Sequence, residues 1–272
     1  MELNVDGRKV YAATGGKPFN SKLPTIVFIH GAAADHTVWK LQTRYFAWHG
    51  HGVLALDMPG HGRSDGPPVP IIEELADWLI AVLDAAGLQQ AALVGHSIGS
   101  LTTLNAAARY PERVSALALL GCAYPMRVNN ELLNSARANE DLAKQLTNAW
   151  GYGRAAQLGR HTIPGTWMLK GGMRLVEGSA EGILFNDMNA CDKYNGGEAA
   201  AGRVNCPTLS IMGEKDMMTP LKAARKTAAL IAGAQETVIA GAGHNMMDEA
   251  PDETLDALRG FLAARSPHGG HD

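Results

Sequence analysis

The sequence predicts an α/β protein in which a mostly parallel sheet is covered by helices. Short apolar segments typical of buried strands, such as 25–29 and 53–56, alternate with segments that follow a helical period, such as 71–86. This alternation stops over residues 122–202 and then returns. With 272 residues, of which 46% are hydrophobic, the chain is long enough to bury a large core.

The first half of the chain is expected to supply most of the strands. Asp6-Gly7 is a turn signal between two short segments, and it predicts an antiparallel hairpin at the start of the sheet. A helix is expected over 71–86, where the apolar residues share one face. A second helix should follow Ser97 and end before Pro111. The expected strands of this half are 25–29, 53–56, 91–94 and 114–120.

The second half begins with a stretch of different character. Residues 122–202 are rich in glycine and partly helical, whereas strands are expected again at 208–212 and 236–239, before a final amphipathic helix at 251–264. A long insertion between core strands commonly carries function, often as a lid. The expected organisation is an α/β core of residues 1–121 and 203–265, a cap or lid insertion of residues 122–202, and a flexible tail of residues 266–272.

Composition excludes several classes of protein. Lys and Arg number 24 and Asp and Glu number 27, which gives a net charge of −3, and no basic run is present, so we expect neither nucleic acid nor a membrane surface as a partner. No apolar run approaches the roughly 18 residues that span a bilayer, and the start of the chain has no secretory pattern. Cys122, Cys191 and Cys206 are few and widely spaced, which disfavours disulfides and a thiolate zinc site. We therefore expect a cytoplasmic protein.

Residues 95–99 match the pattern G-x-S-x-G, with Ser97 at the centre. A serine presented on a tight strand-to-helix turn needs small neighbours two positions away, and the following helix directs its first amides at the site. A glycine-rich turn with a surface serine would give the same five residues. The apolar strand before the pattern and the helix after it favour a nucleophilic serine.

A serine nucleophile needs a base and an acid that orients the base. Among the ten histidines, His244 follows the last expected strand on a loop, at the carboxyl end of the sheet where catalytic groups gather. Asp216 follows the strand ending near Met212 and gives the chain order Ser, Asp, His. Glu214 is the competing acid, and a helix-capping role is the alternative reading of Asp216.

Acyl transfer also needs two donors directed at the developing oxyanion. The N–H of Ile98, directly after the serine, is the first expected donor. The second should come from the loop after the strand 25–29, where small residues let the backbone approach a substrate. We expect the Ala32 N–H, with the Ala33 N–H as the alternative.

Six motifs together resemble the α/β-hydrolase fold family, and in particular its single-domain bacterial members with a helical cap. They are His30-Gly31, the segment 57–64 (DMPGHGRS), the segment 95–99, the segment 110–114 (YPERV), the segment 213–216 (GEKD) and Gly243-His244. The resemblance implies an eight-stranded, mostly parallel sheet whose second strand is antiparallel. It also implies a Ser97–Asp216–His244 triad, and a supporting role for Asp57, His61 and Ser64 rather than a catalytic one.

The expected function is that of a serine hydrolase that cleaves a carboxylic ester or related acyl substrate through an acyl-enzyme. The expected substrate is a small molecule with an apolar acyl or ester group, because the cap should present an apolar face to Ser97. No metal and no organic cofactor is expected. Within the same fold, a carbon–carbon bond hydrolase, a lactonase and a cofactor-free haloperoxidase-like enzyme remain alternatives, and a non-catalytic ligand receptor is the alternative of another class. The sequence predicts no oligomeric state.

Overall fold

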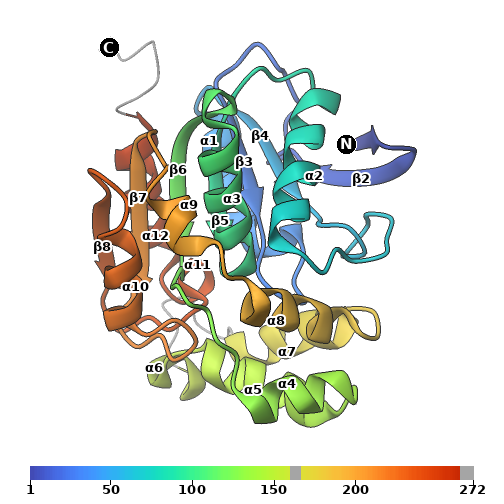
Figure 1. Cartoon of the computed structure of the whole chain (residues 1–272), viewed down its shortest axis with the longest axis vertical. Helices are drawn as coiled ribbons and strands as arrows, with labels where there is room; N and C mark the ends of the chain where they lie inside the picture. The colour runs from blue at the N-terminus through green and yellow to red at the C-terminus, as the bar shows by residue number, and fades with distance from the viewer. Residues whose placement is uncertain (160–166, 264–272) are drawn as a thin grey trace.

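A computed structural model of the chain describes residues 1–159 and 167–263 (Figure 1). Its described part contains an eight-stranded sheet in the order β1-β2-β4-β3-β5-β6-β7-β8. β1 pairs antiparallel with β2, β2 pairs antiparallel with β4, and the remaining pairs are parallel. The strands are β1 (Glu2–Val5), β2 (Arg8–Ala13), β3 (Thr25–Ile29), β4 (Gly52–Leu56), β5 (Ala91–His96), β6 (Val114–Leu120), β7 (Thr208–Gly213) and β8 (Gln235–Ile239). The predicted fold class is confirmed.

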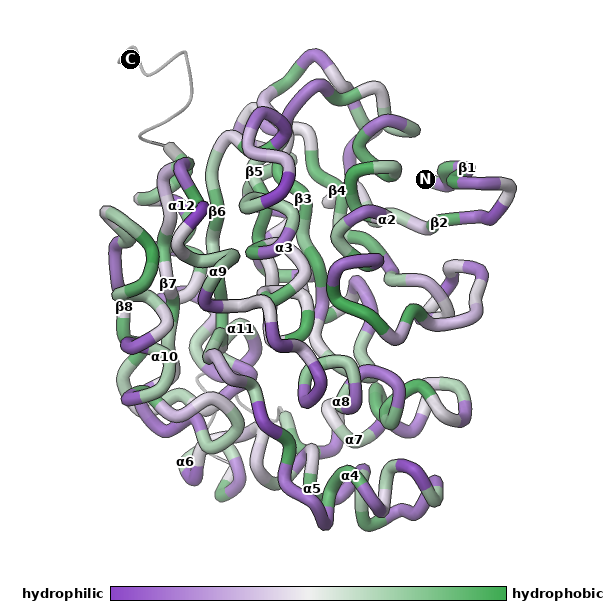
Figure 2. The backbone as a smooth tube through the Cα atoms, in the orientation of Figure 1, coloured by the Kyte–Doolittle hydropathy of each residue, from purple (hydrophilic) through white to green (hydrophobic). Residues whose placement is uncertain are grey.

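Strands β3, β4, β5 and β7 are buried on both faces, and alternate residues of each strand point to opposite faces. Val27 and Ile29 belong to the core under α2 and α3, whereas Ile26 and Phe28 belong to the core under α1 and α12. Figure 2 shows hydrophobic colour along most of β3 and β4, as expected for strands covered on both sides. The helices of these layers are α1 (Lys40–Trp48), α2 (Ile72–Ala85), α3 (Ile98–Arg109) and α12 (Pro251–Ala263), and α10 (Leu221–Ala228) packs on β7.

Several helices lie in the chain between β6 and β7, within the span where a cap is predicted. They are α4 (Asn130–Arg137), α5 (Asp141–Gly151), α6 (Arg154–Gln157), α7 (Met168–Gly178), α8 (Ile183–Lys193) and α9 (Gly197–Ala201). Figure 1 shows α4, α5, α7 and α8 gathered at one end of the sheet, while α9 packs against α3. The exact cap boundaries stay a prediction, and the predicted tail at 266–272 lies outside the described residues, as do residues 160–166.

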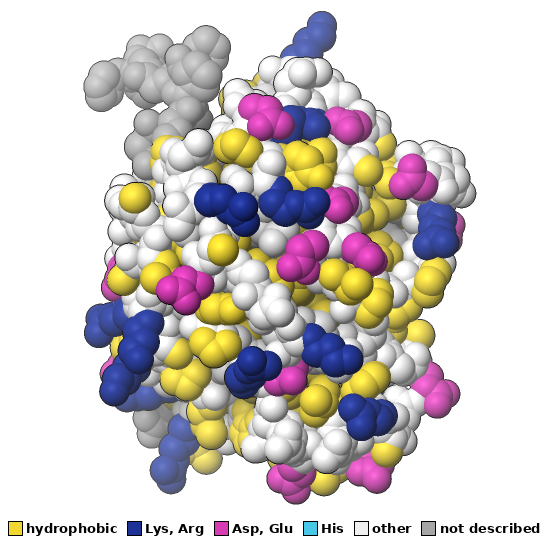
Figure 3. Space-filling model, in the orientation of Figure 1, with side chains coloured by type: hydrophobic (Ala, Val, Ile, Leu, Met, Phe, Trp, Pro, Cys, Tyr) yellow, Lys and Arg dark blue, Asp and Glu magenta, His cyan; other side chains and the backbone are white. Residues whose placement is uncertain are grey.

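The surface of the described residues carries both signs of charge. Figure 3 shows Lys and Arg side chains interspersed with Asp and Glu over one face of the molecule. Among residues 1–159 and 167–263, no helix has the length and apolar character needed to cross a bilayer.

Candidate active site

Ser97 stands at the junction of β5 and α3, in a backbone conformation that non-glycine residues rarely adopt. Its φ is 55° and its ψ is −119°. A Cβ at Gly95 would collide with the carbonyl of Gly99, and a Cβ at Gly99 would come within 2.5 Å of the Ile29 carbonyl oxygen. Glycine is therefore required on both sides of the turn, which explains the spacing of the sequence pattern. Ser97 itself is half-buried.

Asp216 and His244 form a buried pair, with 2.8 Å between Asp216 Oδ2 and His244 Nδ1. The other oxygen, Oδ1, accepts the Met218 and Thr219 N–H groups, both at 2.8 Å, and Thr219 Oγ1 donates to Oδ2 at 2.6 Å. Although burial opposes it, the neighbouring His244 and these donors lower the pKa of Asp216. The carboxylate is thus held ionised, and it fixes the imidazole with Nδ1–H donating, so that Nε2 remains as the basic nitrogen.

Glu214, the other acid considered from the sequence, is placed differently. Its carboxylate accepts the Gly241 N–H at 2.9 Å and pairs with Lys215 at 3.1 Å. These contacts lower the pKa of Glu214. Among the described residues, the acid bonded to His244 is therefore Asp216.

His96, the residue before the serine, also contacts His244. The two ring centroids are 4.6 Å apart, and His96 Nε2 donates to the His244 carbonyl at 3.0 Å, since a carbonyl only accepts. Burial, together with His244, lowers the pKa of His96 to about 3, so this ring is neutral. His96 therefore positions the backbone of His244, a role that the sequence analysis did not assign.

The loop after β3 reaches the site because its residues are small. A Cβ at Gly31 would lie 2.6 Å from His96 Nδ1 and 3.4 Å from the Ser97 Cβ. Ala33 has a φ of 50°, and its N–H donates to Asp187 Oδ2 at 2.9 Å. The Ala33 amide is therefore already hydrogen-bonded within the protein. Within the described residues, no hydrogen bond is found from the N–H of Ala32 or of Ile98.

Asp187, on α8, also bonds His61, with 2.8 Å between Oδ2 and His61 Nε2. His61 Nδ1 donates to the Pro59 carbonyl at 3.0 Å, so both ring nitrogens carry protons. Burial opposes this charge, but Asp187 raises the pKa of His61, and His61 in turn lowers the pKa of the buried Asp187. The result is a buried ion pair between α8 and the loop after β4. Asp187 was not predicted from the sequence, because it lies in no recognisable motif.

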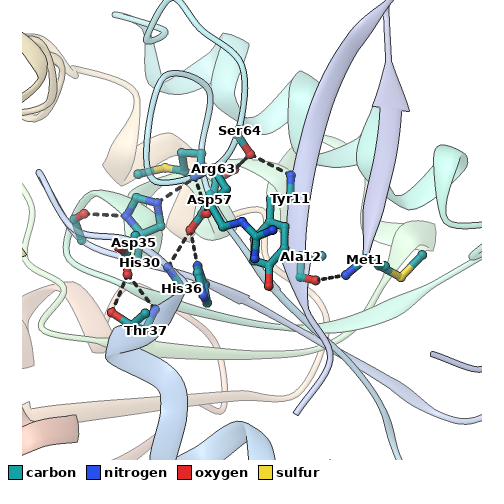
Figure 4. Close-up of polar contacts among 12 residues, drawn as sticks. Met1, Tyr11, Ala12, His30, Asp35, His36, Thr37, Asp57, Arg63 and Ser64 are labelled. Atoms are coloured by element: carbon teal, nitrogen blue, oxygen red, sulfur yellow. Dashed lines mark hydrogen bonds and ion pairs between the residues drawn. The ribbon is translucent and has the colours of Figure 1, made fainter. Parts of the chain in front are cut away.

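Asp57 organises the loop that follows β4 (Figure 4). Its Oδ1 accepts from the His36 N–H at 2.7 Å and from His36 Nδ1 at 2.8 Å, and its Oδ2 accepts the Arg63 N–H at 2.8 Å. Ser64 Oγ donates to the Asp57 carbonyl at 2.7 Å and accepts the Tyr11 N–H at 2.9 Å. Despite burial, the bonds from His36 lower the pKa of Asp57. These contacts fit a supporting role for the loop.

Asp57 and two residues that follow β3 form a group of side chains whose spacing would suit a metal ion. Ligand atoms of Asp35, His36 and Asp57 lie within 4.8 Å of one another. However, His36 Nδ1 is bonded to Asp57, and Asp35 Oδ1 accepts from the N–H and the hydroxyl of Thr37 at 2.8 and 2.5 Å. Hydrogen bonding within the chain accounts for this group.

Ser97 and Ala32 line two cavities. The smaller has a volume of about 60 Å³ and is also lined by His244, Thr147 and Asn148. The larger has a volume of about 260 Å³ and is mostly apolar. Its apolar lining residues are Met126, Val128, Leu132, Trp150, Met188, Cys191, Met217 and Met218.

Known proteins resemble this chain in sequence and structure. The sequence profile of the alpha/beta hydrolase fold matches residues 24–251. The (E)-2-((N-methylformamido)methylene)succinate hydrolase of Acinetobacter baylyi is 24% identical over 244 residues, which cover 87% of this chain and 89% of that protein. The enol-lactonase from Burkholderia xenovorans LB400 has a TM-score of 0.84 at 23% identity, over 97% of this chain and all of that one (100%). A thermophilic esterase has a TM-score of 0.81 at 27% identity, over 97% of each chain.

Proposed function

Because the chain belongs to the alpha/beta hydrolase fold family, we propose that this hydrolase cleaves a carboxylic ester or a related acyl bond through an acyl-enzyme on Ser97. The observation that supports this most is the Asp216–His244 pair, whose imidazole lines the same cavity as Ser97. The similarity to a thermophilic esterase, at 27% identity, favours ester chemistry.

In this mechanism, His244 Nε2 takes the proton of the Ser97 hydroxyl while the serine oxygen attacks the acyl carbon. The imidazolium that forms is stabilised by Asp216, which stays ionised because four donors surround its two oxygens. His244 then returns the proton to the leaving group. A water molecule attacks the acyl-enzyme with His244 again acting as base, and Ser97 is regenerated.

The Ala32 and Ile98 amides would hold the oxyanion. Ile98 follows Ser97 in the chain, and Ala32 lines the same cavities as Ser97. Ala33, the alternative considered from the sequence, already donates to Asp187. Preorganised amide donors stabilise the negative charge that develops in the transition state more than they stabilise the substrate carbonyl. The proposed steps use only side chains and amides of this chain.

The apolar cavity of about 260 Å³ supports a small-molecule substrate with an apolar group. Met126, Trp150 and Met188 come from the span between β6 and β7, so we expect this cap segment to contribute to substrate choice. Each buried methylene is worth about 0.8 kcal/mol. The rate should therefore rise with chain length until the cavity is filled.

The experiment is a hydrolysis screen over esters, lactones, thioesters and vinylogous diketones, combined with labelling by a fluorophosphonate. We expect ester hydrolysis, and we expect the label on Ser97 in the native protein but not in Ser97→Ala. A folded protein that takes no label and hydrolyses no ester would overturn the proposal, and turnover of the diketones alone would favour the carbon–carbon bond hydrolase.

A further inference from the structure

The smaller cavity beside Ser97 has a polar wall supplied by α5. Asn148 is 8% exposed, and its Oδ1 has no hydrogen-bond partner among the described residues. The neighbouring Thr147 Oγ1 is also buried without a partner. Both residues line the cavity that contains Ser97 and His244. Buried polar atoms are nearly always hydrogen-bonded, so two unpartnered atoms in residues that line the same cavity point to a ligand.

A hydrogen bond from the amino group of Asn148 fixes the orientation of its side-chain amide. Nδ2 donates to the Leu169 carbonyl at 3.0 Å, and a carbonyl only accepts, so the amino group must face Leu169. Oδ1 is then the free atom, and it is an acceptor. Gly172 packs closely against this part of the cavity wall, since a Cβ at that position would come within 2.7 Å of Oδ1. The ligand of this wall must therefore supply a hydrogen-bond donor.

The position of His244 distinguishes the two cavities. In the proposed mechanism the imidazole returns a proton to the leaving group, so the leaving group must lie on the imidazole side of Ser97. Among the described residues, His244 lines the smaller cavity and is not part of the lining of the larger one. The smaller cavity is therefore the leaving-group side, and the larger apolar cavity is the acyl side.

We propose that the smaller cavity is a subsite for a leaving group that carries its own hydrogen-bond donor. A hydroxyl or N–H on that group donates to Asn148 Oδ1, and Thr147 Oγ1 completes the site as a donor or an acceptor. The volume of about 60 Å³ suits only a few non-hydrogen atoms, since a single water needs about 10–15 Å³. The substrate class is thus an apolar acyl ester of a small hydroxylated or amino alcohol. This inference rests on the proposed function.

A matched pair of esters tests the subsite. 2-Hydroxyethyl hexanoate and propyl hexanoate have leaving groups of nearly equal size that differ in a terminal hydroxyl or methyl group. We expect kcat/KM to be at least about tenfold higher for the hydroxyethyl ester, because a site built to hydrogen-bond a substrate discriminates against the analogue that lacks the donor. In Asn148→Leu, which keeps the size of the side chain, this ratio should fall to about one.

The ratio of the kcat/KM values for the two esters shows whether Asn148 binds the substrate or only supports the fold. Gln157→Leu is the matched control, because Gln157 Nε2 donates to the Ala149 and Tyr152 carbonyls nearby but does not line the smaller cavity. It should leave the ratio unchanged. If Asn148→Leu does not fold, Thr147→Val removes the second polar atom with little change of shape, and it should also lower the ratio.

Equal kcat/KM for the two esters in the native protein, with Ser97 still labelled by the fluorophosphonate, would overturn the subsite and leave the proposed function standing. A ratio that survives in both Asn148→Leu and Thr147→Val would overturn it as well. If neither ester is hydrolysed and Ser97 takes no label, the proposed function fails and the subsite with it.

Discussion

Asp187 and Ala33 are separated by 154 positions in the chain, yet Asp187 Oδ2 accepts the Ala33 N–H at 2.9 Å. The bond ties α8 to the loop after β3, where Ala33 has the unfavourable φ of 50°. Backbone strain of this kind persists only where surrounding contacts hold it. Asp187 is therefore a positioning residue for the loop that carries the neighbouring Ala32 amide.

Asp187→Asn should reduce catalysis more than binding. The Ala33 N–H and His61 Nε2 both donate to Oδ2, and the uncharged amide oxygen of an asparagine binds these two donors more weakly than an ionised carboxylate does. We expect kcat to fall by roughly 10- to 100-fold with little change in KM, because the oxyanion donors act mainly in the transition state. Steady-state kinetics on one ester will show this, and an equal change in KM with kcat intact would contradict it.

The same substitution should also destabilise the protein through His61. The His61 side chain is 3% exposed and that of Asp187 is 2% exposed, so Asp187→Asn leaves a buried imidazolium without its partner. Breaking a buried pair in this way costs about 3–5 kcal/mol. Urea unfolding at pH 6 measures the loss. The double variant His61→Asn/Asp187→Asn removes both charges and should recover part of it; no recovery would mean that charge is not the cause.

Replacement of the two neighbouring acids should have very different effects. Asp216→Asn disrupts the carboxylate that holds His244 Nδ1–H, and kcat should fall by about 10⁴-fold, as in other triads. Glu214→Gln changes only an exposed contact with Gly241 and Lys215, and kcat should stay within about twofold. Kinetics of both folded variants provide the comparison. The reverse ranking would assign the orienting role to Glu214.

Acidification should destabilise the fold through two histidines that are buried as neutral rings. Burial lowers the pKa of His30 from 6.5 to about 4 and that of His96 from 6.5 to about 3. Below pH 6.5 the unfolded chain therefore binds protons that the folded chain excludes, and stability decreases as the pH falls toward 4. Each histidine contributes on the order of 3 kcal/mol over this range.

Two further groups titrate in this pH range: burial lowers the pKa of His51, which adds to the loss on acidification, and burial raises the pKa of Glu249, which opposes it. The pKa of His61 is raised above 6.5, so its contribution is fully present below 6.5 and is lost only as the pH rises through the folded value. The lowered pKa values of Asp187 and Asp216 matter below 3.8.

Urea unfolding at pH 7 and at pH 4.5 measures the difference in the free energy of unfolding between these two pH values. His96→Gln, whose amide nitrogen can take the place of Nε2 and donate to the His244 carbonyl, should reduce this difference; an undiminished difference would exclude His96 as a source.

Local patterns predicted much of this architecture, because strands with two buried faces are continuous apolar runs. The strand expected at 114–120 coincides with β6, and the helix expected at 71–86 matches α2 (Ile72–Ala85). By contrast, α1 and α10 were not predicted. The short α10 is amphipathic, but its buried residues Ala224, Thr227 and Ala228 are small or polar, so the sequence lacks the stripe of large apolar residues that indicates α2.

The site was predictable only where a turn or a strand end constrains the local sequence. Ser97 needs glycines at fixed spacing, and the order of Asp216 and His244 follows the order of strands. Asp187 and Asn148 have no such local requirement. Their importance arises from partners or cavities assembled by tertiary packing, and a helix sequence alone contains no sign of them.

The hydrogen bond from His96 to the His244 carbonyl has a mechanical consequence. His96 precedes Ser97 directly in the chain, so the strand-to-helix turn and the last loop of the sheet are cross-braced at a single point. Because this hydrogen bond joins the two loops, we expect that a displacement of one loop also moves the other. We therefore expect the distance between the Ser97 and His244 backbones to be less sensitive to motion of the cap helices.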